Sequence, residues 1–517
     1  MIEAVHPQPT TWVLAEIVLT DRLLRSWVRC RRRAWLDQQG PADQRQWSAH
    51  RALALQEQVQ SFQALVAVRP RHGLPAAQAG AEAVVGLRLK GAAPGGLRLE
   101  AHPPLLQRIT GSSLWGPWRY QPVLARQGYR TTREHRLQLA LWGRLLEPLQ
   151  QAPVPHGLVV AGGARLQQER LALGAGLQQQ LDDSLQRLAA DLERSNPPPL
   201  VSDRKKCTLC SWKQLCDQQA AAEGHLSEVS GIGGKRRELL LGHGIGSLAE
   251  LAATDPEQLA AQLESSDPQH AKQHAAIAAE LVAQARVQLG GRPERLEAAV
   301  ALPELSEVPG VLLYDIESDP DARDDFLHGF VMLRRQSDGT WPAPGSQSLA
   351  RAPYKPLLAL HEHGEARLWK RLQVLLAAYP GWPLLHYGET ESLALVRLAQ
   401  RQGASEAQIG ALRSRCIDLH ARLRRSWRLP VGSYGLKATA SWLGFRWSQS
   451  GVDGARCLLW WRQWRQWRTG LRHLQQIFLY NRDDSLASWT VAHWLLTQDR
   501  CGGSTKASGT EMASSGP

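Results

Sequence analysis

The most constraining feature of this chain is an apolar stretch at residues 311–316 that runs into two acids, in the order VLLYDIES. Such a run predicts a buried strand, and Asp315 and Glu317, which are two residues apart, would point to the same face of it. Adjacent carboxylates repel each other and are costly to desolvate. A divalent cation resolves this conflict, because Mg²⁺ and Mn²⁺ prefer carboxylate oxygens. The alternative is a strand end that simply emerges into solvent.

Further acids follow in the same C-terminal region, where predicted strands and helices alternate to about residue 496. Glu391 stands five residues after His386, in a predicted helix. A later amphipathic helix carries Tyr480 and Asp484, which share one face because they are four residues apart. Asp483 is rotated by about 100° around this helix, so we expect it to face solvent. The pattern predicts an α/β domain whose acids converge on folding.

This region resembles the DEDD exonuclease superfamily, which has an RNase H-like fold, and most closely its YprB-type branch. The matching motifs are YDIE, HYGETE and YNRDD in the family's order, with a DL pair at residues 418–419 and SYGLK at residues 433–437, over about residues 308–496. The resemblance implies that two divalent cations, Mg²⁺ or Mn²⁺, are held by four carboxylates: Asp315, Glu317, Glu391 and Asp484. Glu391 stands where the family more usually has Asp, and its longer side chain can still reach.

Phosphodiester hydrolysis would give roles to two more residues of this region. Two cations about 4 Å apart can activate a water and stabilise the leaving oxygen together. Tyr480 would orient that water, and Lys437 would pair with a phosphate or with the transition state, unless it is an ordinary surface lysine. We therefore expect a metal-dependent nuclease, a 3′-to-5′ exonuclease acting on DNA or RNA. The alternative is a non-catalytic nucleic-acid-binding or scaffold protein.

Tryptophan and arginine recur at helical spacing late in the chain, at Trp460, Trp464 and Trp467 and at Arg462, Arg465 and Arg468. Aromatic faces beside Arg suit stacking on single-stranded bases. The other interpretation is a buried tryptophan stripe with a solvated arginine face, and we prefer it because amphipathic helices commonly bury such a stripe.

The chain has seven cysteines, of which Cys207, Cys210 and Cys216 are clustered and Cys30 lies far away in a basic helix. We expect this helix over residues 21–35, with Thr20 as its N-cap. An odd number of cysteines without a recognisable secretion signal argues against a disulfide framework. Four thiolates can instead ligate one [4Fe–4S] cluster or one zinc ion, and free buried thiols are the remaining alternative.

One distant and three clustered cysteines, over residues 15–220, resemble the iron–sulfur staple of RecB-like nucleases, which have a restriction-endonuclease-like fold. Such nucleases carry an acid after one strand and an acid-x-Lys on the next, for metal binding and for charge in the transition state. These positions hold Pro104, Leu124 and Arg126 here, although the family's helix motif persists at residues 138–142. We expect a domain that keeps the fold and the cluster but not the cleavage chemistry, unless another alignment recruits Glu100 or His102.

The segment between these regions, LSEVSGIGGKRRELLLGHGIGSLAELA, resembles a helix-hairpin-helix module with two glycine-bearing turns. The first turn contains Gly231 and Gly233, and its backbone N–H groups, together with the next helix N-terminus, can hold a phosphate. Lys235 and Arg236 would add charge without sequence preference. A purely structural helical connector is the alternative.

The totals fit a nucleic-acid partner, because the 517 residues carry a formal net charge of +13. A base-composition bias toward Arg and Ala is the alternative. We see no apolar run of about 18 residues, so we expect no membrane contact and a cytoplasmic location. The predicted fold is a multidomain α/β architecture. It has a restriction-endonuclease-like domain at residues 1–222, a helix-hairpin-helix module with a helical linker at 223–300, an RNase H-like domain at 301–497 and a disordered tail at 498–517.

Overall fold

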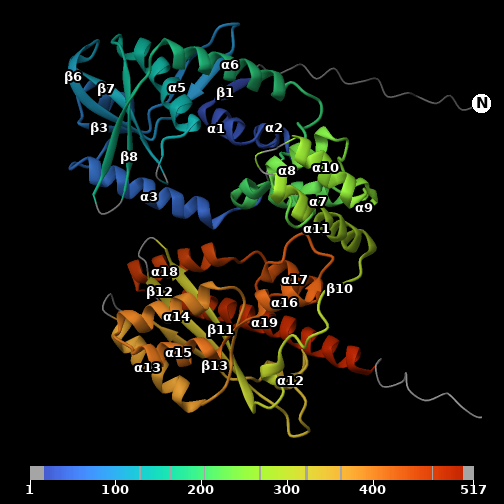
Figure 1. The fold of residues 1–517 in the computed structure, drawn as a ribbon. Coiled ribbons are helices and arrows are strands. Elements are labelled where there is room, and N and C mark those ends of the chain that lie inside the picture. The colour runs from blue at the N-terminus through green and yellow to red at the C-terminus, as the bar shows by residue number, and fades with distance from the viewer. Residues whose placement is uncertain are drawn as a thin grey trace, which may run out of the picture. The chain divides into compact units, whose positions relative to one another are not determined.

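The structure is a computed structural model of residues 1–517, and it describes residues 17–504 except 127, 129, 163–164, 203, 267–268, 270, 321–323, 361–363 and 469. The chain forms two compact units, Met1–Val201 with Lys205–Gln218, and Ser202–Arg204 with Gln219–Pro517 (Figure 1). No helix in the described part combines the length and the apolar character needed to cross a membrane.

A six-stranded sheet forms the centre of the first unit, in the order β2-β3-β6-β7-β8-β9. Its strands are β2 (Arg71–His72), β3 (Ala83–Val85), β6 (Leu105–Ser113), β7 (Gly116–Ala125), β8 (His156–Ala161) and β9 (Gln167–Ala172). β7 and β8 are parallel, so the chain must cross over between them, and it does so through α5 (Arg133–Gln150). A smaller sheet joins β1 (Val18–Thr20), β5 (Arg98–Ala101) and β4 (Leu89–Ala92).

Helices pack against these sheets, and the buried Leu137 and Leu141 of α5 belong to the larger of the apolar clusters described in this unit. The other helices are α1 (Asp21–Arg29), α2 (Arg31–Gln39), α3 (Ala49–Leu65), α4 (Gly73–Gln78), α6 (Ala175–Leu192) and α7 (Lys213–Ala222), with short 3-10 turns η1 (Ala42–Gln44) and η2 (Arg204–Leu209). Leucines at such helical spacing bury one face of α5 against the sheet.

The prediction of a single helix over residues 21–35 is wrong, because Cys30 is extended (φ −163°, ψ 119°) and separates α1 from α2. Thr20 caps α1 as expected, accepting a hydrogen bond from Leu23 N at 3.1 Å. Asp191 of α6 accepts from Trp27 Nε1 at 2.7 Å and forms an ion pair with Arg31. The two short helices are therefore bound to the same buried acid on either side of the break.

The second unit begins with a helical module. It consists of η3 (Leu226–Glu228), α8 (Gly234–Gly242), α9 (Leu248–Ala253), α10 (Pro256–Ser266) and α11 (Ala271–Gly290). Leu240, Leu251 and Leu281 are among the buried residues that join these helices. The turns before and after α8 contain Gly231 (φ +92°) and Gly244 (φ +78°), in a conformation that glycine adopts without a Cβ penalty.

A five-stranded sheet forms the centre of the remaining domain, in the order β13-β12-β11-β14-β15. Its strands are β11 (Gly310–Asp319), β12 (Asp324–Arg334), β13 (Tyr354–Leu358), β14 (Leu384–His386) and β15 (Cys416–Asp418). β12 runs antiparallel to both β11 and β13, whereas β14 and β15 run parallel to β11. A short pair, β10 (Glu294–Arg295) with β16 (Trp427–Arg428), connects the domain to the helical linker.

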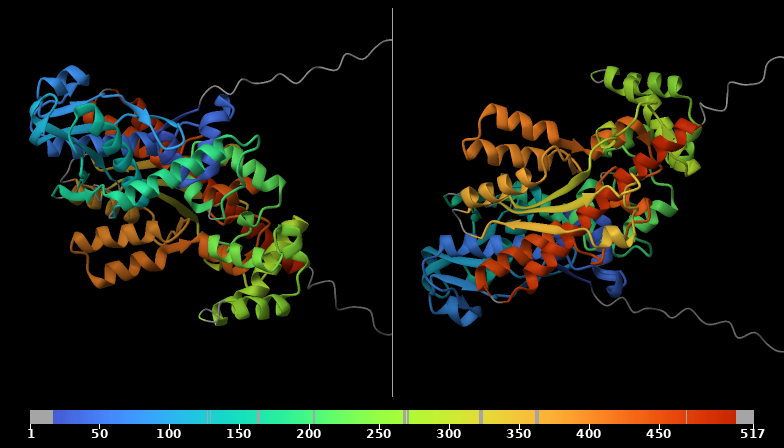
Figure 2. Two further views of the ribbon diagram at one scale, coloured as in Figure 1. Left: turned by 90° about the horizontal axis from the view of Figure 1, so that it is seen from above. Right: turned by 90° about the horizontal axis from the view of Figure 1, so that it is seen from below.

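Helices cover both faces of this sheet. They are α12 (Gln347–Ala350), α13 (Glu365–Ala378), α14 (Thr390–Arg401), α15 (Glu406–Arg415), α16 (Leu419–Ser426), α17 (Leu436–Trp442), α18 (Gly454–Trp467) and α19 (Arg472–Ser504), with the turn η5 (Pro303–Leu305). Leu312 and Tyr314 of β11 pack with α13, α14 and α15, whereas Val311 and Leu313 pack with α19. Figure 2 shows α19, in red, packed against one face of the strands.

This alternation determines where the acids point. Side chains along a strand alternate between faces, so Asp315 and Glu317 lie on the face of Val311 and Leu313, which α19 covers. α19 also continues to Ser504. The disordered tail predicted to start at residue 498 was therefore placed too early, because residues 498–504 belong to this helix. Residues 505–517 of that predicted tail lie outside the described residues.

Candidate metal centre and nucleic-acid surfaces

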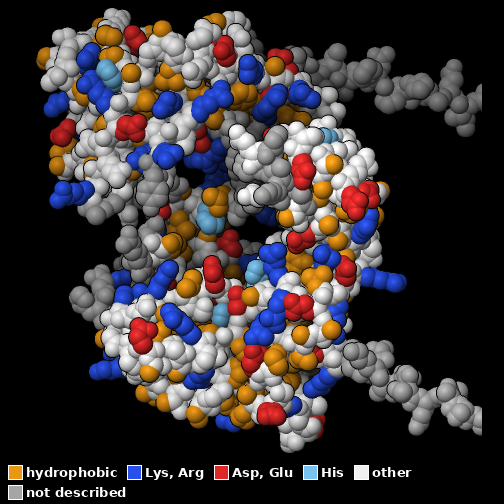
Figure 3. Space-filling model, viewed as in Figure 1, with side chains coloured by type: hydrophobic (Ala, Val, Ile, Leu, Met, Phe, Trp, Pro, Cys, Tyr) orange, Lys and Arg blue, Asp and Glu red, His pale blue; other side chains and the backbone are white. Residues whose placement is uncertain are grey.

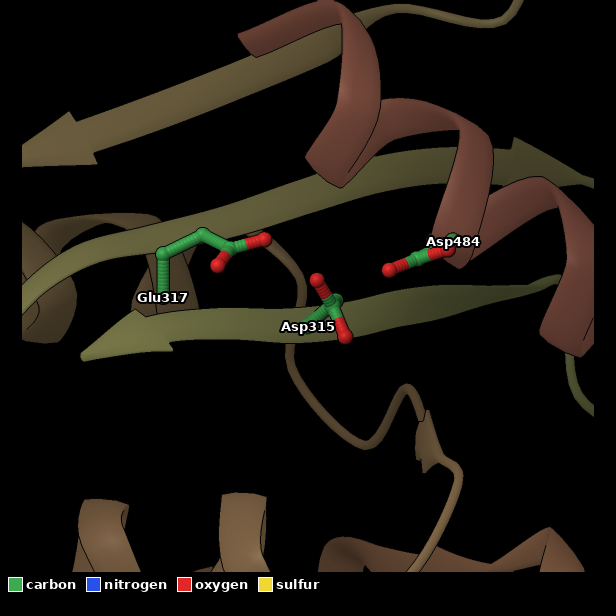
Figure 4. Close-up of side chains that lie close together, drawn as sticks. All are labelled: Asp315, Glu317 and Asp484. Carbon is green, nitrogen blue, oxygen red and sulfur yellow. The ribbon is translucent and has the colours of Figure 1, made fainter. Parts of the chain in front are cut away.

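Three of the predicted acids lie together. Asp315 and Glu317 come from β11 and Asp484 from α19, and each offers an oxygen within 4.8 Å of the others (Figure 4). Glu317 and Asp484 are 7% and 9% exposed, so these carboxylates are largely withdrawn from water. The crossing of one strand and one helix, whose acids are 167 to 169 residues apart in the chain, creates this acid cluster.

Glu391, the fourth predicted acid, is not a member of this acid cluster, which among the described residues consists of Asp315, Glu317 and Asp484. Glu391 lies beside it. It stands in the first turn of α14, 9% exposed, with Oε2 4.0 Å from His386 Nδ1. That oxygen is buried and makes no hydrogen bond to the described residues. The charge of Glu391 still raises the pKa of both Asp315 and Glu317, which places it close to them.

The electrostatics of the acid cluster fit a cation. Burial raises the pKa of Asp315 and of Glu317 well above the usual range, and the charge of Asp484 raises both further. Burial also raises the pKa of Glu391 to about 7 and that of Asp484 to about 6. A nearby positive charge reverses such shifts. Because the donors are all carboxylate oxygens, the set suits hard cations such as Mg²⁺ or Mn²⁺.

A buried amide holds Asp315 in place, which the sequence interpretation did not include. Asn481, on α19, donates from Nδ2 to Asp315 Oδ2 at 2.6 Å and accepts from the Tyr354 hydroxyl at 2.9 Å. A Cβ built on Gly329 would lie 1.6 Å from Asn481 Oδ1, so the amide occupies the space that a side chain would need. The only signal in the sequence was the position of Asn481 inside the YNRDD motif.

Three hydrogen bonds join Asp483 and Asp484 to one loop. Trp447 donates its indole N–H to Asp484 Oδ1 at 2.6 Å. The solvent-facing position expected for Asp483 is wrong, since it is 6% exposed and accepts from Ser448 N at 2.8 Å and Ser448 Oγ at 2.6 Å. The loop after α17 folds over α19, so a residue turned away from the acid cluster is still buried.

Lys437 and Tyr480 lie next to the acid cluster. The Lys437 ammonium is 5.0 Å from the centre of the Tyr480 ring and 5.9 Å from that of Trp447, and it donates to Val452 O at 2.7 Å. Its charge lowers the pKa of Glu317 and of Asp484, against the larger effect of burial. Tyr480 is 5% exposed, and burial raises the pKa of its phenol, so the phenol keeps its proton.

The tryptophan stripe of α18 is mixed in character. Trp464 is 8% exposed and stacks on Trp461, whereas Trp467 is 56% exposed. Trp461 also stacks on Phe326, with ring centres 4.5 Å apart, so this part of the stripe belongs to the core. Arg462 is not a solvated arginine, because it binds Asp319 at the end of β11 through an ion pair of 2.7 Å. α18 is thereby fastened to the acid-bearing strand.

The structure brings Cys30 near two of the clustered cysteines. Burial raises the pKa of the Cys30 thiol, and the Cys210 and Cys216 thiols add smaller contributions in the same direction. No disulfide joins the cysteines of the described part, and no three of their sulfurs lie within 4.8 Å of one another. Neighbouring contacts connect the same segments, among them Trp212 Nε1 to Asp37 Oδ1 at 3.0 Å.

The N-terminal positions that would carry nuclease acids lack ligand atoms. Leu124 lies in β7 and is 4% exposed, and Arg126 donates to Gln167 Oε1 at 2.8 Å. Glu100, the alternative acid, pairs with Arg88 and lies 3.5 Å from His102 Nε2. Among the described residues of this unit, no three His, Cys, Asp or Glu ligand atoms come within 4.8 Å of each other.

Contacts within the helical module fix the predicted phosphate-binding turn, whose Gly231 is exposed. Arg236 donates to Gly231 O across the turn, and a Cβ on Gly231 would meet Leu281 of α11 at 3.3 Å. Lys235 is exposed, and Gly233 precedes α8 in an extended conformation. Lys and Arg side chains are otherwise dispersed among Asp and Glu over the visible surface, so net charge alone does not single out a binding patch (Figure 3).

Comparison with known families supports two of these assignments. Residues 312–496 match the family model described as RNase_H superfamily, and residues 223–262 match the SAM-like Helix-hairpin-helix tandem. No curated protein matches the chain. Both kinds of domain are typical of proteins that bind nucleic acid, and the first is typical of nucleases. The chain therefore contains a C-terminal domain of the RNase H superfamily, preceded by a tandem of helix-hairpin-helix motifs.

Proposed function

We propose that this chain is a metal-dependent exonuclease of the YprB type that removes nucleotides from the 3′ end of DNA or RNA. The observation that supports this proposal most is the meeting of β11 and α19, which brings Asp315, Glu317 and Asp484 within 4.8 Å. A fourth acid, Glu391, stands beside them, and its buried Oε2 makes no hydrogen bond to the described residues. All four lie inside the segment that matches the RNase H superfamily.

In this proposal the four acids hold two divalent cations, Mg²⁺ or Mn²⁺. When bound, the cations supply an activated water and a counter-charge for the leaving oxygen. The chain's own residues position the reacting groups. Asn481 leaves one oxygen of Asp315 for other contacts because it donates to a single carboxylate oxygen, whereas Asp484 is hydrogen-bonded by both Trp447 and Tyr480.

Lys437 and Tyr480 would act on the substrate. The Lys437 ammonium, next to the acid cluster, can bind a phosphate oxygen that approaches it. Tyr480 remains protonated near neutral pH, because burial raises the pKa of its phenol, so it can orient water as a donor but does not serve as a base.

The test is cleavage of end-labelled single-stranded DNA and RNA in Mn²⁺ by the full chain and by Asp484→Asn. We expect Mn²⁺-dependent shortening from the 3′ end, lowered more than about 100-fold by the substitution, because loss of a metal ligand should exceed the roughly 10- to 100-fold effect of losing a residue that only supports one. Asp338→Asn is the control, since Asp338 is an exposed acid in a turn away from the acid cluster. Equal cleavage by wild type and Asp484→Asn would refute the site, and binding without cleavage would favour a scaffold.

We further propose that residues 1–222 form a RecB-like domain that binds a [4Fe–4S] cluster through Cys30, Cys207, Cys210 and Cys216, with zinc as the alternative. The proximity of Cys30 to Cys210 and Cys216 supports this proposal. The domain would position nucleic acid without cutting it, because the acid positions hold Pro104 and Leu124. Residual metal-dependent cleavage by full-length Asp315→Asn would show a second active site and contradict this part.

A further inference from the structure

A pocket lies where the helix-hairpin-helix module meets the RNase H domain within the second unit. Its walls come from the first hairpin turn at Ser230 and Gly231, from Arg236 of α8, from α11, and from the segment between Arg424 and Tyr434. Neither the helical module nor the RNase H domain forms this pocket alone. The pocket is separate from the acid cluster, whose residues do not line it.

Hydrogen bonds hold the pocket walls together. Gln284 of α11 donates to Leu429 O at 2.8 Å and accepts from the Tyr434 hydroxyl at 3.2 Å. The same hydroxyl accepts from Leu429 N at 2.8 Å. On the other side, a Cβ on Gly432 would lie 2.5 Å from Glu228 O, so the two backbones touch. The residues that line the pocket are thus fixed by buried contacts rather than by loops alone.

The pocket carries excess positive charge. Arg236, Arg424 and Arg428 line it, against a single acid, Glu280. Arg428 is paired with Glu294. In the described part of the chain, Arg236 and Arg424 form no ion pair with a carboxylate, and Arg236 Nε is buried without a hydrogen-bond partner. Two guanidinium groups that face one pocket beside a single acid, and that form no ion pair with a described residue, favour an anionic ligand with paired oxygens, such as a phosphate.

The aromatic residues indicate which part of such a ligand the pocket meets. Tyr434 is 8% exposed and lies under the Arg424 guanidinium, 5.5 Å from its ring centre, so its face is not open to a base. Trp427 is 7% exposed, and its indole N–H is buried with no hydrogen-bond partner among the described residues. The pocket thus offers donors and positive charge rather than a stacking surface, which fits a sugar–phosphate backbone.

We propose that this pocket binds the phosphodiester backbone of a nucleic-acid strand, as a contact site additional to the acid cluster. The proposal rests on the proposed function in that the bound strand is the substrate. The Tyr387 hydroxyl donates to Tyr434 O, and Tyr387 follows His386 at the end of β14. The pocket wall is therefore bonded to the strand end that precedes Glu391, which connects the proposed contact site to the domain that carries the acid cluster.

The experiment measures binding without cleavage. Fluorescence anisotropy of a labelled single-stranded oligonucleotide with the full chain in EDTA is recorded over a series of salt concentrations. Arg424→Gln is compared with Arg425→Gln, its neighbour on α16, which pairs with Glu297 and does not line the pocket. We expect Arg424→Gln to reduce the slope of log affinity against log salt by about 0.7, the contribution of one lost phosphate contact on a single strand. Arg236→Gln/Arg424→Gln should reduce it by about 1.4.

The outcomes separate this proposal from the proposed function. A wild-type slope in Arg424→Gln and in the double variant, with oligonucleotide binding intact, overturns the pocket assignment and leaves the nuclease untouched. Equal losses in Arg424→Gln and Arg425→Gln also overturn it, because a general charge effect explains them. Displacement of the oligonucleotide by millimolar inorganic phosphate as readily as by unlabelled strand would show a free-anion site instead. Absence of any binding by wild type would contradict both. Circular dichroism melts check that each variant is folded.

Discussion

Asn481 is fully buried and makes two hydrogen bonds, one to Asp315 and one from Tyr354. Its oxygen fits only because residue 329 is glycine, where a Cβ would lie 1.6 Å away. The orientation of a predicted metal ligand therefore depends on the absence of a side chain on the neighbouring strand β12. Residues of this kind, which hold a ligand without touching the metal, commonly affect metal affinity strongly.

Gly329→Ala should weaken Mn²⁺ binding about 10- to 100-fold, because it displaces Asn481 from Asp315. Isothermal titration of the full chain with Mn²⁺, without nucleic acid, measures this. Asn481→Ala should act similarly, and the double variant should be no worse than either single one. Gly410→Ala is the matched control, since its Cβ meets nothing within 4 Å in helix α15 and should add a few tenths to 1 kcal/mol of stability. Additive losses in the double variant would contradict this chain of contacts.

The metal-free protein should lose stability as pH rises from about 4 to 7. Burial raises the pKa of Glu391 from 4.5 to about 7, so the folded state binds more protons than the unfolded state in this window. At 1.36 kcal/mol per pKa unit, Glu391 alone accounts for up to about 3 kcal/mol. Thermal melts in EDTA at pH 5 and pH 8 measure the difference. Glu391→Gln should flatten the dependence, and saturating Mg²⁺ should restore stability at pH 8. A pH-independent melting temperature in EDTA would contradict this prediction.

At the scale of elements, α19 supplies most of the acid cluster's surroundings. Its period places Tyr480 and Asp484 on one face, while Asn481 reaches Asp315 and Asp483 reaches the loop at residues 445–448. Trp447 in that loop donates to Asp484. One helix therefore positions acids through contacts on three of its sides. Because neighbours lie on these sides, its residues 474–495 are largely buried.

Asp483→Ala should release the loop that carries Trp447. It removes two hydrogen bonds to Ser448 and leaves the Ser448 N–H without its partner, which costs about 1–3 kcal/mol. Hydrogen exchange followed by mass spectrometry should show faster exchange at residues 445–448, with Mn²⁺ affinity reduced less than in Asp484→Asn. Asp499→Ala, at the far end of α19, is the comparison, because Asp499 binds Arg295 and Ala301 N instead. Unchanged exchange in the loop would refute the coupling.

At the scale of the whole chain, the segments around Cys30 and Cys210 are about 180 residues apart and lie side by side in the first unit. Gln46 N donates to Ser211 O at 2.9 Å, and Arg45 pairs with Asp37 beside Trp212. These contacts close a long loop of chain around the sheet. Closing so long a loop is entropically costly, and a bound cluster would hold it closed.

Protein purified without oxygen should contain iron and sulfide, which Cys30→Ser should remove together with several degrees of melting temperature. Metal analysis and visible absorbance measure the cluster. Cys416→Ser is the control, since Cys416 lies in β15 of the other unit. Zinc in place of iron would support the alternative ligand, and a metal-free protein with unchanged stability in Cys30→Ser would contradict a cluster altogether.

The local predictions succeed where a backbone period decides the outcome. A two-residue spacing places Asp315 and Glu317 on one face of β11, and a four-residue spacing places Tyr480 and Asp484 on one face of α19, because strands and helices repeat at 2.0 and 3.6 residues. Thr20 caps α1 because capping depends on a neighbour three residues away. The family matches at residues 312–496 and 223–262 agree with the corresponding motifs.

What failed or was missed depends on contacts between distant residues. Four features require neighbours that lie far away along the chain. They are the break at Cys30, the burial of Asp483, the fit of Asn481 against Gly329 and the position of Arg236 in the pocket wall beside the RNase H domain. The sequence alone determined which acids share a face, because that is a property of one element. Only the tertiary structure decided which elements meet, because packing, unlike periodicity, depends on the shape of every side chain at the contact.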